Sequence, residues 1–283
     1  MTADALPVGL RERVLAAARE LRAPGRTVPD VPDISPVEAC SRAADAFLGL
    51  LTSLADADWR RPVLRDLDVA GLVGHLTGVE DDVQRALDGD RDVACVDHVA
   101  STQAAAEHAA SRSPEEARRA WRAAADRTLE RVRGADLDVV VPLHGMRLPL
   151  GALLVVRAFE LWTHENDIRR AAGLPASVPD AATLRRMTEL AVLLLPYGVA
   201  RVSDPVPPLD VHLVLTGAGG GTWDVAVGER TGPAPEVAIV ADAVGFCRLV
   251  ADRITPADLG AQVSGAAGAA DVVLTGAAAL ALD

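Results

Sequence analysis

Apolar residues recur every three or four positions through most of the first 200 residues, which is the period of amphipathic helices. The helices that this pattern predicts cover residues 36–54, 69–88, 98–112, 114–133 and 149–172. Ser35 and Pro36 suit the start of the first helix, Asp68 can cap the second, and Gly173 closes the last. Four of these segments are long and apolar on one face, so they predict a helix bundle.

Residues 8–22 also have a helical period, but the segment that follows them, APGRTVPDVPDISP, contains four prolines. Because proline interrupts regular structure, we predict a helical extension and a linker at 1–34, ahead of a bundle at 35–175. The role of this extension stays open: it could pack over the bundle, contact a partner or remain solvated.

The pattern changes after Asp180. One more helix is predicted at 180–195, and the segments DVHLVLTG, GTWDVAVG and PEVAIVAD then alternate or run apolar over strand lengths. The glycines of GAGGG, at 217–221, join two such segments without leading into a helix, so they predict a hairpin turn and no phosphate-binding loop. A helix from Ala243 to Asp252, a strand at DVVLTG and a terminal helix follow. The predicted fold class is α + (α+β), with the α+β domain at 176–283.

Composition narrows the class of partner. Half of the 283 residues are hydrophobic, and all 28 basic residues are arginine. The net charge of −12 argues against nucleic acid or an anionic membrane as a partner. No signal peptide or membrane span is recognisable, so we expect a soluble, cytoplasmic protein, either a monomer or a homodimer.

The cysteines do not suggest chemistry of their own. Cys40, Cys95 and Cys247 are odd in number and lack the CxxC spacing of metal or redox sites. We expect all three to be small buried residues rather than nucleophiles.

Three polar residues on two predicted helices are the main candidates for a site. Glu160 and His164 lie one helical turn apart on one face of a helix, and His75 lies on another helix. Two imidazoles and one carboxylate are a common ligand set for a divalent metal that keeps open positions. The alternatives are an ordinary core histidine and a surface pair of Arg157 with Glu160, or of Glu160 with His164.

Other polar residues near these three are weaker candidates. Asp167 follows His164 by three residues and could accept a hydrogen bond from its imidazole. Glu165 and Asn166 point elsewhere around the helix, so we expect them to be solvated. His144 sits in a loop where it could edge a pocket. The remaining histidines, which have no supporting pattern, are His98, His108 and His212.

Three segments resemble a known family as a set. They are the loop Asp-Trp-Arg-Arg-Pro after the first helix, LDVAGLVGHLTGVEDDV around His75, and VVRAFELWTHENDIRRAAGLP around Glu160. Together, residues 36–173 resemble the N-terminal domain of the mycothiol-dependent maleylpyruvate isomerase family, a DinB-like metal-binding four-helix bundle. Residues 180–283 are similar to the C-terminal domain of that family, which is related to the sterol-carrier fold.

The resemblance implies roles for particular residues. His75, Glu160 and His164 would bind a divalent metal, usually zinc, and Asp167 would help to hold the cosubstrate mycothiol. The family also places an arginine of the second domain near the cleft.

We expect that arginine to be Arg248 or Arg253, both in the predicted helix GFCRLVADRI. Members of the family often carry Gly-Trp where this chain has Glu165-Asn166, which leaves the metal site intact but changes the expected substrate.

This resemblance, with the composition, leads to a first hypothesis about function. A free thiol has a pKa near about 8.5, and a divalent metal stabilises its thiolate. Mycothiol would supply the thiol for attack on a small electrophile, either as an S-transferase in detoxification or secondary metabolism or as a cis–trans isomerase of the maleylpyruvate type. The alternative is a non-catalytic protein on the same fold that binds a small ligand or acts as a regulator.

Overall fold

The computed structural model describes residues 31–229, 234, 236–266 and 268–281. Most of the predicted N-terminal extension therefore lies outside the described residues. Residues 33–283 form one compact unit. The division of this unit at residue 175 stays a prediction, and both of its predicted parts are described below.

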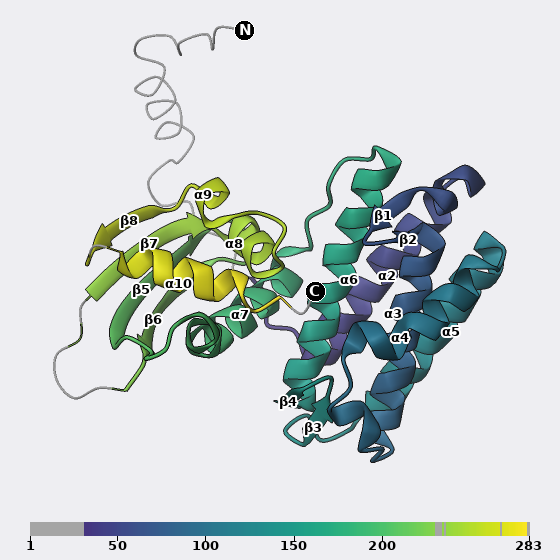
Figure 1. Ribbon diagram of the computed structural model, residues 1–283, viewed down its shortest axis with the longest axis horizontal. Helices are drawn as coiled ribbons and strands as arrows, with labels where there is room; N and C mark the ends of the chain where they lie inside the picture. Colours follow the sequence, from purple (N-terminus) through teal and green to yellow (C-terminus); the bar gives the residue numbers. More distant parts are fainter. Residues whose placement is uncertain (1–30, 230–233, 235, 267, 282–283) are drawn as a thin grey trace, which may run out of the picture. The chain divides into compact units, whose positions relative to one another are not determined.

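The first half of this unit is a helix bundle, as predicted (Figure 1). Its helices are α2 (Pro36–Ser53), α3 (Val69–Leu87), α4 (His98–Ala110), α5 (Pro114–Val132) and α6 (Leu150–Ala172). The predicted ends hold: the side chain of Ser35 accepts from the backbone N–H of Glu38 at 3.1 Å, and Asp68 caps α3 through Gly71 at 2.8 Å. Gly173 ends α6 in the left-handed conformation, with φ 70°.

Short elements connect the helices of the bundle. They are the 3-10 turns η1 (Asp56–Arg60) and η2 (Asp92–Ala94), and the hairpins β1 (Pro62–Leu64) with β2 (Leu67–Asp68) and β3 (Val140–Leu143) with β4 (Met146–Pro149). The turn of the second hairpin is held against η2, because the N–H groups of His144 and Gly145 donate to the carbonyls of Val93 and Ala94 at 2.9 and 2.8 Å.

Helices α3 and α4 approach each other closely at two glycines. A Cβ on Gly74 would lie 2.5 Å from the carbonyl oxygen of Ala105, and a Cβ on Gly78 would lie 3.0 Å from the side chain of Thr102. Only glycine fits at Gly74 without moving the α4 backbone. This contact brings the side chain of Thr102 within reach of the face of α3 that carries His75.

The second half is a small α+β region. Its elements are α7 (Ala181–Val202), β5 (Leu209–Thr216), β6 (Gly221–Val227), β7 (Glu236–Asp242), α8 (Ala243–Val250), α9 (Pro256–Leu259), β8 (Gln262–Gly265) and α10 (Ala269–Ala278). The strands form one sheet in the order β6-β5-β7-β8, in which only β5 and β7 are parallel. The predicted hairpin turn at 217–221 is confirmed, since β5 and β6 pair antiparallel across it.

One face of the sheet is covered by helices. Every second residue of β5 is buried, including Val211, Leu213 and Leu215, and Val237 and Ile239 of β7 join the same apolar cluster. Helices α7, α8 and α10 supply the other side of this core, and Figure 1 shows α8 and α10 lying over the sheet. The strand period of two thus explains why the predictions for β5 to β7 were correct.

The prediction failed for the end of the chain. The segment DVVLTG at 271–276 is part of α10 and forms no strand, while the fourth strand is β8. A short apolar run fits a buried helix as well as a strand, and here Val273, Leu274 and Ala277 face the core at helical spacing. All residues of β8 are exposed, so this edge strand carries no apolar alternation that could reveal it.

Helix α7 is longer than predicted. The prediction ended this helix at residue 195, just before Pro196. In the structure the helix continues through Pro196 to Val202. Leu195 and Val199, on either side of the proline, are both fully buried in the apolar cluster under the sheet. Tertiary packing of these residues offsets the cost of a proline within a helix. Among the described residues, no helix is both long and apolar enough to cross a membrane.

The contact between α7 and α10 yields a test of the packing. Replacing Gly198 with alanine would place a Cβ 2.2 Å from the carbonyl oxygen of Gly276, so one helix must move. We expect Gly198→Ala to lower the free energy of unfolding by about 1–3 kcal/mol, measured by urea denaturation. The control is Gly49→Ala in α2, where nothing lies within 4 Å of the new Cβ. That change should stabilise by about 0.5–1 kcal/mol, and equal losses in both variants would contradict the close contact.

Candidate metal centre

Helices α3 and α6 bring the three predicted ligands together. The ligand atoms of His75, Glu160 and His164 all lie within 4.8 Å of one another. The imidazoles are almost fully buried, with exposed fractions of 2% for His75 and 1% for His164. The sequence spacing placed Glu160 and His164 on one face of α6, and the packing of α3 against that face supplies His75.

Two polar atoms of this cluster have no hydrogen-bond partner among the described residues. They are Nε2 of His75 and Oε1 of Glu160, which are buried and lie 3.6 Å apart. A buried polar atom without a partner costs about 1–3 kcal/mol, and such atoms are rare in native proteins. A divalent cation would satisfy both atoms at once. The donor set therefore fits a metal ion by its chemistry and by its unpaired atoms.

The tautomer of His75 follows from its outer hydrogen bond. Its Nδ1 lies 2.6 Å from Oγ1 of Thr102, and the same hydroxyl donates to the carbonyl of His98 at 2.7 Å. Because the hydroxyl proton is engaged with that carbonyl, Thr102 must accept from an Nδ1–H of His75. The lone pair of His75 is then on Nε2, which faces Glu160. Burial lowers the pKa of His75, which favours this neutral form.

His164 is held in the same way by Asp167. Its Nδ1 lies 3.1 Å from Oδ2 of this aspartate, which is buried and also accepts from Arg253 at 2.9 Å and Arg170 at 2.8 Å. Burial alone would raise the pKa of Asp167, but the hydrogen bonds from His164 and Arg253 lower it to about 2. An ionised Asp167 keeps the proton of His164 on Nδ1 and its Nε2 free for a metal.

Glu160 belongs to a buried ion-pair network. Arg157, which is 1% exposed, donates to Glu160 and also to Glu80 at 2.8 Å. Although burial would raise the pKa of Glu160, the charge of Arg157 lowers it, so the carboxylate is ionised. Arg157 and Glu160 therefore do pair, as one alternative held, but the guanidinium is buried, so this is not a surface pair. Two carboxylates face one guanidinium, and a cation at Glu160 would balance the remaining negative charge.

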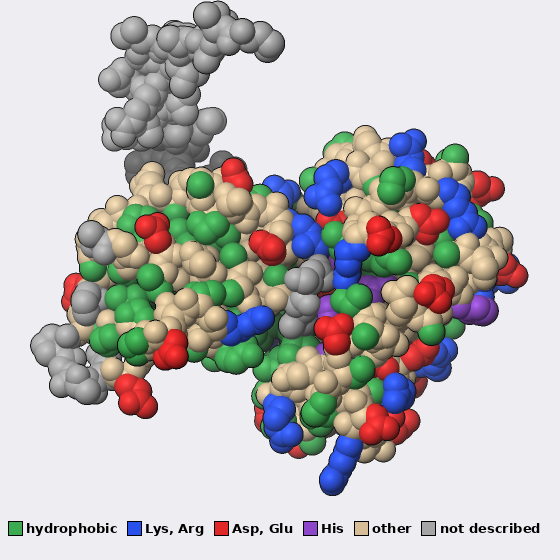
Figure 2. Space-filling view, viewed as in Figure 1, with side chains coloured by type: hydrophobic (Ala, Val, Ile, Leu, Met, Phe, Trp, Pro, Cys, Tyr) green, Lys and Arg blue, Asp and Glu red, His purple; other side chains and the backbone are tan. Residues whose placement is uncertain are grey.

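A cavity of about 670 Å³ opens in front of these ligands. Glu160 and His164 lie on its wall together with apolar residues of α6 and α7, among them Phe159 and Leu194. His144 edges this cavity, as its loop position suggested, and so does His98, for which the sequence offered no signal. Figure 2 shows histidine side chains, in purple, reaching the surface near arginine and apolar side chains.

A second cavity, of about 470 Å³, adjoins the first at Thr163 and Ala251. Its lining includes Asp167 and both predicted arginines, Arg248 and Arg253. The prediction placed both arginines in one helix, but α8 ends at Val250, and Arg253 follows it in a loop after Asp252, whose φ is 53°. That loop aims the guanidinium of Arg253 at Asp167.

The sequence profile of the mycothiol maleylpyruvate isomerase N-terminal domain family matches residues 40–169, a range that contains the whole ligand trio. This part of the chain is therefore similar to the N-terminal domain of that family. The crystal structures of the mycothiol-dependent maleylpyruvate isomerase and of a histidine-to-alanine mutant of it also match. Each has a TM-score of 0.54 and 13% identity; they cover 82% and 81% of this chain and 92% and 91% of their own. At this identity the likeness shows the fold alone, and no curated protein matches the sequence.

Of the two residues expected to depart from the family pattern and to be solvated, Glu165 is buried, so that prediction is wrong for it, and Asn166 is half-buried. Glu165 is buried and pairs with Arg169 at 2.8 Å. The chain after α6 folds back over them, so Asn166 accepts from the N–H of Ser177 at 2.8 Å and Trp162 donates to the carbonyl of Ser177 at 3.1 Å.

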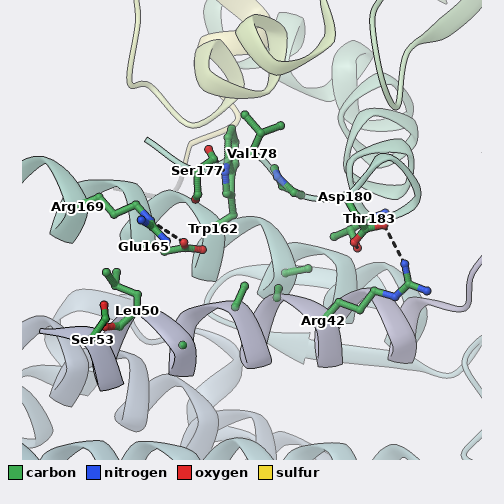
Figure 3. Close-up of a pocket in the computed structure, with 15 residues that line it drawn as sticks. Arg42, Leu50, Ser53, Trp162, Glu165, Arg169, Ser177, Val178, Asp180 and Thr183 are labelled. Carbon is green, nitrogen blue, oxygen red and sulfur yellow. Dashed lines mark hydrogen bonds and ion pairs between the residues drawn. The ribbon is translucent and has the colours of Figure 1, made fainter. Parts of the chain in front are cut away.

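Glu165 and Trp162 also line a third pocket, of about 330 Å³, beside α2. Figure 3 shows the Glu165–Arg169 pair at one part of this pocket and Arg42 near Asp180 at another. The pocket includes none of the three metal-ligand candidates. Glu165 and Asn166 therefore change the contacts of α6 with neighbouring segments, and all three candidate metal ligands are retained.

The cysteines are only partly as predicted. Cys40 and Cys247 are buried, and burial raises the pKa of the Cys40 thiol to about 12 and raises that of Cys247 as well. Cys95, which was also expected to be buried, is exposed because it ends the turn η2 on the surface. None of the three lines the cavity at the candidate ligands.

Proposed function

We propose that this chain is a mycothiol-dependent metalloenzyme in which His75, Glu160 and His164 hold a divalent metal, with zinc the first candidate. The observation that carries the proposal is the pair of unsatisfied buried atoms, His75 Nε2 and Glu160 Oε1, beside a second imidazole. A metal bound there would lower the pKa of a thiol and stabilise its thiolate. Three protein ligands leave at least one coordination position open.

The chain's own residues prepare this site before any ligand enters. Thr102 and Asp167 each fix the proton of one imidazole on Nδ1, which directs the lone pairs of both Nε2 atoms toward the metal position. Arg157 keeps Glu160 ionised through its positive charge. Both imidazoles would thus present Nε2, and Glu160 an ionised carboxylate, to a metal.

The thiol is proposed to come from a cosubstrate because no described residue supplies one at the cavity. The family match names mycothiol, and the second cavity provides polar groups for such a molecule, including Arg248. Asp167 is proposed to act there through its partners, since its oxygens already accept from His164, Arg253 and Arg170.

The first cavity favours a small electrophile that carries an anionic group. Arg147 and Arg201 line it, and neither makes an ion pair with a described residue. A guanidinium binds a carboxylate through two parallel hydrogen bonds. Addition of the thiol to a conjugated double bond, rotation and elimination would give a cis–trans isomerase, whereas addition or displacement without reversal would give an S-transferase.

The experiment that tests the proposed function has two steps. Metal is first measured in protein purified without chelator, and a metal-free wild type that also fails to take up zinc would overturn the proposal. The loaded protein is then incubated with mycothiol and either maleylpyruvate or a panel of electrophiles. Mass spectrometry and chromatography distinguish a stable adduct from an isomerised product. Ligand binding without either product would favour the non-catalytic alternative.

The proposal also predicts the behaviour of the exposed cysteine. Cys95 should be the first cysteine to react with a thiol reagent, because Cys40 and Cys247 are buried. Since the reacting thiol belongs to the cosubstrate, Cys95→Ser should retain the mycothiol-dependent rate within about twofold and abolish rapid labelling. A large loss of rate in this variant, with its metal content unchanged, would point to a protein thiol in the reaction.

A further inference from the structure

His144 occupies a constrained position beside the candidate metal centre. It has a φ of 50°, which is uncommon for a residue with a side chain and can cost of order 1–3 kcal/mol. The hydrogen bond from its N–H to the carbonyl of Val93 holds the turn in place. Its side chain is only 4% exposed and lies on the wall of the same cavity as Glu160 and His164. The fold thus places a further imidazole on the wall of the cavity that two of the candidate ligands line.

A buried carboxylate orients this imidazole. Nε2 of His144 lies 3.0 Å from Oδ2 of Asp82, and the hydroxyl of Ser101 donates to the same oxygen at 2.5 Å. Arg85 donates to the other carboxylate oxygen at 3.0 Å. Burial would raise the pKa of Asp82, but the bonds from His144 and Ser101 lower it, so the group is ionised. His144 therefore donates its Nε2–H to Asp82, and Nδ1 is the ring atom that can take up a proton.

The other groups around the cavity are poorly suited to exchange a proton. His164 and Glu160 are candidate ligands whose remaining hydrogen-bonding atoms are engaged with Asp167 and Arg157. Arginine does not release its proton in proteins, and tyrosine does so only near about pH 10.

His98 remains, and its ring lies between those of His75 and His144, with centroid distances of 5.4 and 5.8 Å. For His144, the hydrogen bond to Asp82 at 3.0 Å places a carboxylate that would stabilise the charged form of its ring.

We propose that His144, held by Asp82, is the general acid–base residue of the site, an inference that rests on the function proposed above. In an addition reaction, Nδ1 takes the S–H proton while the sulfur keeps the bonding electron pair. The sulfur then bonds to the electrophilic carbon, and the π electrons of the double bond move toward the conjugated carbonyl. His144 returns the proton to the neighbouring carbon, so the net change is addition of S–H across the double bond. Reversal after rotation gives the isomer.

The test compares wild type, His144→Gln and Asp82→Asn as zinc-loaded proteins. The probes are mycothiol with ethacrynic acid, a conjugated ketone that carries a carboxylate, and mycothiol with maleylpyruvate. Loss of a general acid–base group should lower the rate about 10²- to 10⁴-fold in His144→Gln, with zinc content unchanged. Asp82→Asn should lower it in the same direction by less, because it keeps the imidazole. Added imidazole should restore part of the rate of His144→Ala.

The matched control is His108→Gln, which changes an exposed histidine of α4 and should leave the rate unchanged. Rates within twofold of wild type in both His144→Gln and Asp82→Asn would overturn the proposed role of His144 but leave the proposed function standing. Loss of zinc from His144→Gln would also overturn it, because the residue would then be a ligand. If His144→Gln does not fold by near-ultraviolet circular dichroism, Asp82→Asn and the imidazole rescue decide the question. A zinc-loaded wild type that reacts with neither probe overturns the proposed function itself.

Discussion

Glu160→Ala is expected to abolish metal binding at the proposed site and to leave the fold intact. The variant keeps both imidazoles but loses the anionic ligand, whose Oε1 has no other partner. Its removal also leaves Arg157 paired with Glu80 at 2.8 Å, so no unbalanced charge is created in the interior. We therefore expect the zinc content to fall from about one ion per chain to near zero, and the affinity to fall more than about 100-fold.

Metal analysis after dialysis and competition with a chromophoric chelator measure these quantities. The control is Glu38→Ala in α2, which removes a half-exposed glutamate that pairs with Arg42. It should bind zinc like the wild type. Retention of zinc by Glu160→Ala, with His164→Ala losing it, would show that the ion is held by other residues and that Glu160 serves only the ion-pair network.

We expect Arg157→Met to lower the free energy of unfolding more than substitution of any of the three candidate metal ligands does. The guanidinium pairs with both Glu80 and Glu160; Arg157 and Glu80 are buried, and the side chain of Glu160 is 17% exposed. Methionine fills much of the volume but leaves the buried Glu80 and the largely buried Glu160 without the charge of the guanidinium. Breaking a buried ion pair from one side costs about 3–5 kcal/mol, and we expect a loss of this size in the free energy of unfolding.

The loss is measured by urea denaturation of metal-free protein, so that zinc at Glu160 does not compensate. The control is Arg133→Met, which breaks an ion pair with Glu130 in which both side chains are at least 70% exposed. Such a surface pair contributes about 0–1 kcal/mol. Addition of zinc should recover part of the stability of Arg157→Met through its charge. Equal stabilities for the two variants would contradict the interior position of the network.

Local pattern was enough to place most of the fold and all three ligand candidates. The helix ends could be predicted from residue types a few positions away in the sequence, as at Ser35, Asp68 and the glycine after α6. Glu160 and His164 fall on one face because a helix turns every 3.6 residues. Such signals depend only on residues nearby in the sequence, so they can be recognised without knowledge of the tertiary structure.

The residues that support the ligands could not be predicted in this way. Arg157 reaches Glu80 over 77 residues of sequence, and Thr102 reaches His75 over 27. No rule of sequence spacing predicts either contact, because each depends on how two helices pack against each other. His98 is the first residue of α4, a helix with alanines around its whole circumference. Because α4 has no distinct apolar face, the sequence pattern does not single out His98. The strand β8 was missed for the related reason that an exposed edge needs no apolar residue.

The close approach of α3 and α4 has a consequence for how this protein can change over evolution. The candidate ligand His75 is preceded directly by Gly74 and followed three residues later by Gly78, and these two positions set how near Thr102 comes to its ring. A side chain at either glycine would retain every ligand yet separate the ring from the hydroxyl that fixes its proton. Relatives that keep the three ligands but not the two glycines should therefore be regarded as carrying a different metal environment, despite an unchanged ligand motif.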